Sequence, residues 1–437
     1  MIATAPSTAR AAAAVEPAAE FPARRLAAYG LLGAPLAMMA LPVYVLVPKF
    51  YFEATGLALS VIGLVLLATR LADAFIDPLL GAWVDRAKTR GSVLGPVLVA
   101  MPPLAIGFVL MFLPPGGMST TAATLWLAAT LTSAYLGYSL ATVAYQAWGA
   151  ELGASDGART RVTAWREGAG LIGVILASVV PYALGSASLV LMFLLTLAVA
   201  LVALVRTAPR PPARTLRQTQ AATPVAAAVG LPLAMPRFRW LLAVFVANGI
   251  AAAIPASLVL FFIADRLELE PRSGIFLALY FIAGAASMPL WARLAQRWPL
   301  EGVWLVGMVA AVVAFVWAYG LGAGDFTAFA LICALSGVAL GADLALPPAL
   351  LARVIERNGH AGQREGAYFG LWNLANKLNL ALAAGIALPA LTLLGYAPGE
   401  RGADALAALS FAYAVVPCML KLAAAGLLAF AWRRNRF

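Results

Sequence analysis

The sequence is poor in charge, in histidine and in cysteine, and each shortage excludes a class of protein. Only 11% of its 437 residues are charged and 63% are hydrophobic, whereas soluble domains average about 25% charged residues. The single histidine, His360, excludes a histidine-based proton relay and a histidine-rich metal centre. The two cysteines, Cys333 and Cys418, lie in apolar segments and predict neither a disulfide framework nor a metal site. The composition indicates an integral membrane protein.

Apolar segments fill most of the chain. A bilayer-spanning helix needs about 20 apolar residues, and twelve such stretches can be read. They lie at roughly 27–48, 58–83, 93–113, 121–148, 164–184, 187–206, 238–264, 274–295, 302–322, 326–350, 366–394 and 405–432. The first is too long for a signal peptide and shows no cleavage site, so we expect a retained helix. The sequence therefore predicts an all-α membrane protein with twelve transmembrane helices.

The longest polar stretch between apolar segments, residues 206–224, lies midway along the chain. It is rich in Pro, Arg, Thr and Gln, which is typical of a solvated linker. Six helices on each side predict two six-helix bundles with a substrate cavity between them. The expected divisions are an N-terminal tail (1–25), a first bundle (26–206), a central cytoplasmic loop (207–236), a second bundle (237–432) and a C-terminal tail (433–437).

Basic residues predict the orientation, because Lys and Arg accumulate in short cytoplasmic loops. They gather at one set of alternate helix ends, and the other set holds few. Those few are Lys49, Arg266, Arg272 and Arg401. Both termini are predicted to be cytoplasmic, in the inner membrane of a cell. The net charge of +11 is spread over short loops and does not form one basic face, so we expect no nucleic-acid partner.

Three charged residues, Arg70, Asp73 and Asp77, lie inside the second apolar segment. Their spacings of three and four place them on one helical face. Charges at membrane depth cost several kcal/mol and normally face the bundle interior. One interpretation is a local ion pair between Arg70 and Asp73 that joins two helices. The other is that the two carboxylates bind a monovalent cation or a proton.

Two lysines also lie within spanning segments. Lys377 falls in the middle of the eleventh segment, where an ammonium group needs an acidic partner. Lys421 falls in the twelfth, where it either snorkels to the interface or faces lipid. The sequence assigns Lys421 no role.

The second helix ends in "GAWVDRAKTRG", which resembles the motif between helices 2 and 3 in the major facilitator superfamily. Gly81, Asp85, Arg86 and Arg90 match that motif. The resemblance implies an intracellular gate that locks and releases helix ends. The alternative is a solvated turn.

Three blocks, residues 70–91, 144–173 and 362–396, resemble the glycoside-pentoside-hexuronide:cation symporters, the group of the melibiose permease. The resemblance implies that Asp73 and Asp77 bind the coupling cation. It implies that Lys377 lies near that cation and takes part in coupling. In the empty site, we expect Arg70 and Lys377 together to hold the two carboxylates. It also implies that Arg166 lies near the sugar.

The chain departs from that family at three places. The first apolar segment contains no acidic residue, and the fourth contains none before Glu151. Arg353 stands where an Asp is usual after the tenth helix. Only two carboxylates then remain for the cation. A cavity with fewer acidic groups and more aromatic lining suits a less hydroxylated or amphipathic solute.

Aromatic, amide and basic side chains in helices 4, 5 and 11 are the candidate substrate contacts, although helix packing and interhelical hydrogen bonds would also explain them. They are Tyr138, Tyr145, Gln146, Trp148, Arg166, Trp372, Asn373 and Asn376. Charged residues near the cytoplasmic helix ends are candidate gate residues, with solvated loop charges as the alternative. They are Glu151, Asp156, Arg159, Arg161, Arg364 and Glu365.

These features predict a secondary transporter that carries a sugar or related small organic solute together with Na+ or H+ by alternating access. A carrier or exporter of an amphipathic molecule on the same fold, and a channel or receptor, remain as alternatives. No catalytic constellation indicates an enzyme. We expect a monomer in the lipid bilayer, with no cofactor and no metal site beyond that of a monovalent coupling ion.

Overall fold

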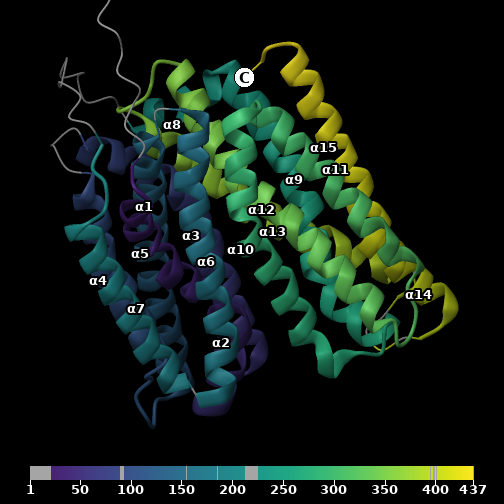
Figure 1. The fold of residues 1–437 in the computed structure, drawn as a ribbon. Coiled ribbons are helices and arrows are strands. Elements are labelled where there is room, and N and C mark those ends of the chain that lie inside the picture. The colour runs from purple at the N-terminus through teal and green to yellow at the C-terminus, as the bar shows by residue number, and fades with distance from the viewer. Residues whose placement is uncertain are drawn as a thin grey trace, which may run out of the picture.

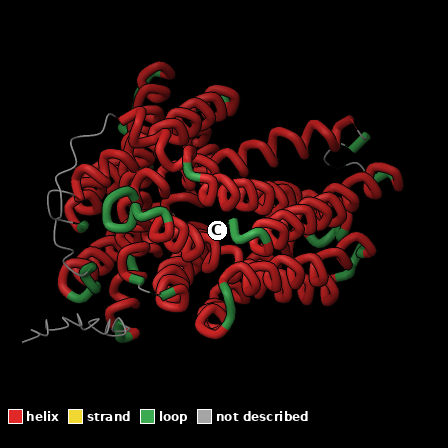
Figure 2. Tube along the Cα trace, turned by 90° about the horizontal axis from the view of Figure 1, so that it is seen from above, coloured by secondary structure: helices red, strands yellow, loops and turns green. Residues whose placement is uncertain are grey.

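A computed structural model describes residues 21–88, 93–153, 155–184, 186–211, 225–393, 395–396, 399 and 401–436. Over these residues the chain forms helices and loops and contains no strand (Figure 2). The N-terminal half contributes α1 (Ala23–Gly30), α2 (Gly33–Thr55), α3 (Leu59–Lys88), α4 (Leu94–Met111), α5 (Thr120–Leu152), α6 (Asp156–Leu184) and α7 (Ser186–Arg206). A short helix, α8 (Val225–Ala234), follows.

The C-terminal half adds six spans, four of which contain a short π or 3-10 segment. They are α9 (Pro236–Phe261) with η1 (Phe262–Arg266); η2 (Glu270–Arg272) with α10 (Ser273–Arg297); α11 (Leu300–Phe315) with η3 (Val316–Gly320); α12 (Phe326–Arg357); α13 (Glu365–Leu393); and α14 (Ala403–Ser410), η4 (Phe411–Val415) and α15 (Val416–Arg433). With α1 and α2 counted as one broken span, the described residues form twelve spans in two bundles. The expected class of fold is confirmed.

Eight of the described helices are long and apolar enough to cross a membrane by composition alone. The other long helices are α2, α3, α6 and α13. Within α3 lie the charged residues Arg70, Asp73 and Asp77, and within α13 lies Lys377.

Several helices extend beyond the apolar segments that predicted them. The helix α6 begins at Asp156, about two turns before its apolar stretch, and α12 continues to Arg357. Arg353, which we expected in a loop, therefore lies in α12. A segment defined by its apolar residues ends at the first charged residue, whereas the backbone hydrogen bonds of the helix continue beyond the hydrocarbon layer. The expected single first helix was also wrong, because a turn at residues 31–32 separates α1 from α2.

The two bundles contact each other through two symmetric helix pairs. The helix α3 packs against α13, and α6 packs against α10 and α12. Counted as spans, these are contacts between 2 and 11 and between 5 and 8. Span 2 of the first half corresponds to span 8 of the second, and span 5 corresponds to span 11. The two contacts are therefore equivalent when the halves are exchanged, as expected for related halves. Figure 1 shows the bundles close together near α8 and the C-terminus and separating toward the opposite end.

We call the end at which α3 finishes and α13 starts the closed end. Glycines allow the helices to approach closely there. A Cβ atom on Gly81 would lie 2.1 Å from the carbonyl oxygen of Gly366, and one on Gly370 would lie 2.6 Å from that of Asp77. No real Cβ contact is that short, so larger residues would force α3 and α13 apart. Small residues permit such close packing in membranes.

Candidate substrate and ion site

A cavity of about 270 Å³ lies between the bundles. Helices α2, α3, α5 and α6 line it from the first bundle, and α9, α12 and α13 line it from the second. Its lining consists of Gly33, Leu36, Ala37, Arg70, Tyr138, Ser139, Thr142, Tyr145, Gln146, Arg166, Glu167, Gly170, Phe245, Asp343, Leu344, Pro348, Trp372, Asn373, Asn376 and Lys377. The volume suits a small organic solute.

A buried group of charges, which we call the interbundle cluster, joins α3, α5 and α13 beside this cavity. Lys377 Nζ lies 2.6 Å from Asp73 Oδ2 and 2.7 Å from Asp77 Oδ2. It also donates to Ser139 Oγ over 2.9 Å, and Ser139 Oγ donates to Asp73 Oδ1 over 2.5 Å. Asp77 is fully buried, and Asp73 is 4% exposed. One ammonium group from the second bundle thus faces two carboxyl groups from the first.

The interbundle cluster has oxygen atoms with bonding capacity left. Among the described residues, no hydrogen-bond donor reaches Asp77 Oδ1. Buried polar atoms are normally paired, so such an atom calls for an explanation. Arg70 lines the cavity, and its guanidinium group lies over the ring of Tyr135 at 5.6 Å. Asp77 Oδ1, the other carboxylate oxygens of the cluster and the hydroxyl oxygen of Ser139 are suitable ligands for a small hard cation, and a carboxylate can also bind a proton.

The cavity walls combine aromatic and polar groups. The rings of Phe245 and Trp372 stack with centroids 3.6 Å apart, and both line the cavity from the second bundle. On the opposite wall, Thr142 Oγ1 and Gln146 Oε1 are buried and receive no hydrogen bond within the described chain. They lie one helical turn apart on α5. A solute with one apolar face and several hydrogen-bonding groups fits such walls.

Seven of the eight candidate substrate residues line the cavity, and Trp148 does not. Trp148 is fully buried within the first bundle, donates to the carbonyl of Pro209 over 3.1 Å and packs edge-on against Tyr29. Tyr145 lines the cavity, but its hydroxyl donates to the carbonyl of Tyr29 over 2.5 Å. Arg166 lines the cavity and binds Glu167 over 2.6 Å.

The first contact at the closed end joins α3 to the start of α13. Asp85 Oδ1 and Oδ2 accept hydrogen bonds from the backbone N–H groups of Gly366 and Ala367 over 2.7 and 2.8 Å. The first N–H groups of a helix have no partner within the helix and attract a carboxylate. Lys88 lies 2.9 Å from Glu365 and also pairs with Glu151. Asp85 and Lys88 thus hold the two bundles together.

The second contact at the closed end joins α6 to α12. Asp156 pairs with Arg353 over 2.7 Å and with Arg159 over 3.4 Å. Arg159 also pairs with Glu356, and Arg353 with Glu301. Acidic and basic groups therefore alternate across the boundary between the bundles. These ion pairs join the first bundle to the second at the closed end.

Of the remaining predicted gate residues, Arg86 lies on α3, Arg161 lies on α6 and Arg364 directly precedes α13, all at the closed end. Arg90 lies outside the described residues. His360 lies in the loop before α13, with Nδ1 2.8 Å from the hydroxyl of Tyr368. Burial and the nearby Arg364 lower the pKa of His360 below its ordinary value of 6.5. His360 is therefore neutral at physiological pH.

A second buried ion pair lies entirely within the C-terminal bundle. Lys421 Nζ is 2.6 Å from Asp343 Oδ2. Asp343 Oδ1 accepts from Asn248 Nδ2 over 3.1 Å and from Trp304 Nε1 over 2.9 Å. We call these four residues the Asp343 cluster. Lys421 therefore neither faces lipid nor reaches the interface, which were the two interpretations that its position in the sequence suggested.

Sequence reasoning missed several residues of the site. They are Ser139, Thr142, Glu167, Phe245 and Asp343 at the cavity, and Lys88, Glu301, Arg353 and Glu356 at the closed end. Asp343 had a signal, because it is a lone carboxylate in an apolar segment. Ser139 and Phe245 had none, because such residues are common in membrane helices.

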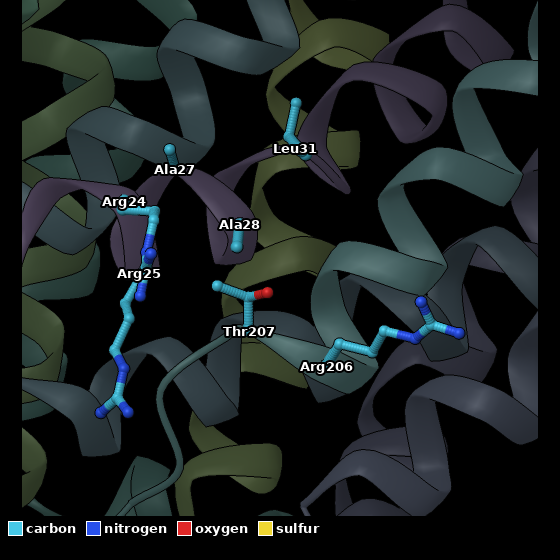
Figure 3. Close-up of a pocket in the computed structure, with 7 residues that line it drawn as sticks. All are labelled: Arg24, Arg25, Ala27, Ala28, Leu31, Arg206 and Thr207. Carbon is cyan, nitrogen blue, oxygen red and sulfur yellow. The ribbon is translucent and has the colours of Figure 1, made fainter.

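A larger pocket of about 500 Å³ lies where α1 begins and α7 ends. Its lining includes Arg24, Arg25 and Arg206, and Figure 3 shows the guanidinium groups of Arg25 and Arg206 pointing in different directions. These arginines are exposed. The pocket lacks convergent polar groups, so the cavity between the bundles is the better candidate for the substrate site.

Comparison with known proteins gives the same picture. Residues 26–432 match the sequence profile of the family described as MFS/sugar transport protein. A relative from Escherichia coli K12, "Putative glycoside/cation symporter YagG", is 31% identical over 122 residues, 28% of this chain and 26% of its own length. "Uncharacterized symporter YjmB" of Bacillus subtilis 168 is 28% identical over 134 residues, 30% of this chain and 29% of its own length. The match thus spans under a third of either relative.

Solved structures share the fold. A bacterial homologue of the iron transporter ferroportin in an outward-facing state aligns with a TM-score of 0.67 at 18% identity, covering 92% of this chain and 100% of that one. The E. coli fucose:proton symporter FucP aligns with a TM-score of 0.64 at 13% identity, covering 91% and 97%. The profile match extends over nearly the whole chain, and the protein therefore belongs to the MFS/sugar transport family of the major facilitator superfamily, a family of transporters rather than enzymes.

Proposed function

We propose that the protein is a symporter that couples the movement of Na+ or H+ to the uptake of a sugar or related small organic solute by alternating access. The proposal rests above all on the interbundle cluster. Asp73 and Asp77 belong to one bundle and Lys377 to the other, so an ion that binds the carboxylates competes with a contact between the bundles. Ion binding and bundle movement are then linked, which is what coupling requires.

The closed end is the cytoplasmic end in this proposal, because basic residues gather there. The protein then faces outward, with the contacts of Asp85, Lys88 and Arg353 forming the shut gate. Both termini lie in the cytoplasm, and the protein resides in the cell membrane. We propose that the functional unit is a monomer.

Purified protein in liposomes tests the ion site before any substrate is known. Equilibrium binding of radioactive Na+, and proton release when Na+ is added, should be measured for wild type, Asp73→Asn and Asp77→Asn. We expect each substitution to abolish ion binding, because it removes one of the two carboxylates. Asp404→Asn is the matched control, since Asp404 is exposed at the start of α14.

Transport follows in the same liposomes, with inward Na+ or pH gradients and a panel of radiolabelled sugars. Gradient-driven accumulation should appear in wild type and in Asp404→Asn and be lost in both cluster variants. Accumulation that persists in Asp73→Asn and Asp77→Asn would refute the proposed coupling site.

A second candidate function is cation-coupled carriage of an amphipathic organic molecule. The stacked rings of Phe245 and Trp372, together with Leu36, Leu344 and Pro348, give the cavity a substantial apolar surface. A thermal-shift panel that includes bile salts and fatty acids beside sugars separates the two. Stabilisation by amphiphiles alone would favour this candidate.

A further inference from the structure

The Asp343 cluster has no counterpart in the motifs that identify the family, yet it reaches the substrate cavity. Asp343 lines that cavity from α12, and its side chain is 14% exposed. Its three partners come from α9, α11 and α15, so four helices of one bundle hold a single carboxylate in place. Burying so polar a group costs free energy unless its hydrogen bonds are satisfied.

The hydrogen bonds of Asp343 leave one acceptor position. An ionised carboxylate offers about four lone-pair sites. Asn248 and Trp304 use two on Oδ1, and Lys421 uses one on Oδ2. The remaining position is on Oδ2, at the atom already oriented by the lysine. A ligand that donates a hydrogen bond would complete the set.

Charge balance favours a neutral ligand. The ammonium group of Lys421 compensates Asp343, so the pair as a whole is neutral. Around the cavity and its two clusters, four basic side chains face four acidic ones. They are Arg70, Arg166, Lys377 and Lys421, and Asp73, Asp77, Glu167 and Asp343. A hydroxyl group can join Asp343 without disturbing that balance, whereas an organic cation would compete with Lys421.

We propose that Asp343 is a substrate-binding residue that accepts a hydrogen bond from a hydroxyl group of a neutral, hydroxylated solute. Asn248, Trp304 and Lys421 are positioning residues that orient it. The inference rests on the proposed transport function and gives it a substrate class. It also explains how the first bundle manages without acidic residues in its first and fourth apolar segments: the second bundle supplies the acceptor.

Neighbouring groups make this recognition specific. Asp343 and the stacked rings of Phe245 and Trp372 lie on the same side of the cavity, because α9, α12 and α13 belong to one bundle. A ring that stacks on the aromatic pair with its apolar face can direct an edge hydroxyl toward a carboxylate. Asn248 is 4% exposed, and its Oδ1 receives no donor from the described residues, which leaves a further acceptor beside Asp343.

Equilibrium binding without an ion gradient tests the inference. The probes are neutral mono- and disaccharides, the monodeoxy analogues of any sugar that binds, and choline and a bile salt for comparison. Thermal shift identifies binders, and tryptophan fluorescence gives their Kd. Wild type and the Asp404→Asn control should bind at least one neutral sugar, and Asp343→Asn should raise its Kd at least tenfold. One monodeoxy analogue should bind wild type and Asp343→Asn equally, because the contacted hydroxyl is already missing.

Loss of Asp343 alone leaves Lys421 as a buried, unpaired ammonium group, which destabilises a fold. The double variant Asp343→Asn, Lys421→Gln removes both charges, and it should elute as a single folded species and show the same tenfold loss. Lys421→Gln alone keeps the carboxylate and two of its partners, so its Kd should rise only two- to fivefold.

Two results would overturn the inference: unchanged sugar affinity in the folded double variant, or a wild type that binds choline or the bile salt and no neutral sugar. Failure of the proposed function looks different. If ion coupling is absent but sugar affinity still depends on Asp343, the symport proposal fails and this inference stands.

Discussion

Two buried groups of charges lie beside the same cavity, and they differ in whether the two bundles share them. In the interbundle cluster, Asp73 and Asp77 of α3 meet Lys377 of α13. In the Asp343 cluster, Asp343 and Lys421 both belong to the second bundle. The first has two carboxyl groups for one ammonium group, and the second has one of each.

This difference separates two roles that charged residues can have in a transporter. A cluster divided between bundles changes its contacts when the bundles move, and its excess carboxylate leaves room for an ion. A balanced cluster whose residues all belong to one bundle is expected to keep its geometry when the bundles move. The first arrangement suits coupling, and the second suits recognition.

Replacing the two lysines tests this division most strongly. Lys377→Met removes the ammonium group that pairs with both Asp73 and Asp77, and losing one partner of a buried pair costs about 3–5 kcal/mol. We expect more than a hundredfold loss of gradient-driven uptake. Lys421→Met should lower uptake but keep the ratio of uptake with the ion gradient to uptake without it. Equal loss of that ratio in both variants would erase the distinction between the clusters.

A second test of the interbundle cluster disturbs the close packing of α3 against α13. Gly370→Ala places a Cβ atom 2.6 Å from the carbonyl oxygen of Asp77, and overpacking of this kind costs about 1–3 kcal/mol. The thermal midpoint should fall by several degrees. Gly426→Ala is the matched control, because nothing lies within 4 Å of its added methyl group. A midpoint that falls equally in both variants would contradict the proposed contact.

The contacts at the closed end give a test with a smaller expected effect, which compares a contact between the bundles with a contact inside one bundle. Asp85→Asn weakens two hydrogen bonds between the bundles, and bonds to charged groups contribute about 1.5–3 kcal/mol. Labelling of Ala37→Cys in the cavity by a thiol reagent supplied from the cytoplasmic side should rise several-fold. Asp265 instead binds Tyr396 and the N–H of Gly399 within the second bundle, so Asp265→Asn should leave labelling unchanged. Both native cysteines are buried.

The aromatic pair gives the smallest expected effect. Phe245→Leu keeps the apolar surface but removes stacking worth about 0.5–1.5 kcal/mol. Sugar binding should weaken three- to tenfold by fluorescence titration, with no change in Na+ binding, because Phe245 supplies no oxygen ligand and belongs to neither charged cluster. A change in Na+ affinity would show that substrate and ion sites are not separable in this way.

Sequence patterns predicted much of this molecule because membrane insertion acts on local composition. Twelve apolar segments had to become helices, since only helices satisfy their own backbone hydrogen bonds in lipid. The family resemblance grouped Asp73 and Asp77 with Lys377, and the need of a lone charge in an apolar segment for a partner agreed with it. The same reasoning failed for Trp148, because an aromatic residue near a cavity and one within a bundle have the same local sequence pattern.

By itself, the sequence determined the membrane class, the number of spans, the face of α3 that carries charge and the need of Lys377 for an acidic partner. Only the tertiary structure decided which partners Lys377 received, and that Lys421 has an acidic partner. Lys377 lies across the boundary from Asp73 and Asp77, whereas Lys421 lies beside Asp343 of its own bundle. Which residues pair depends on how helices that are far apart in the sequence pack together. The free-energy cost of burying a lysine shows that a countercharge is needed, but it does not show which residue supplies it.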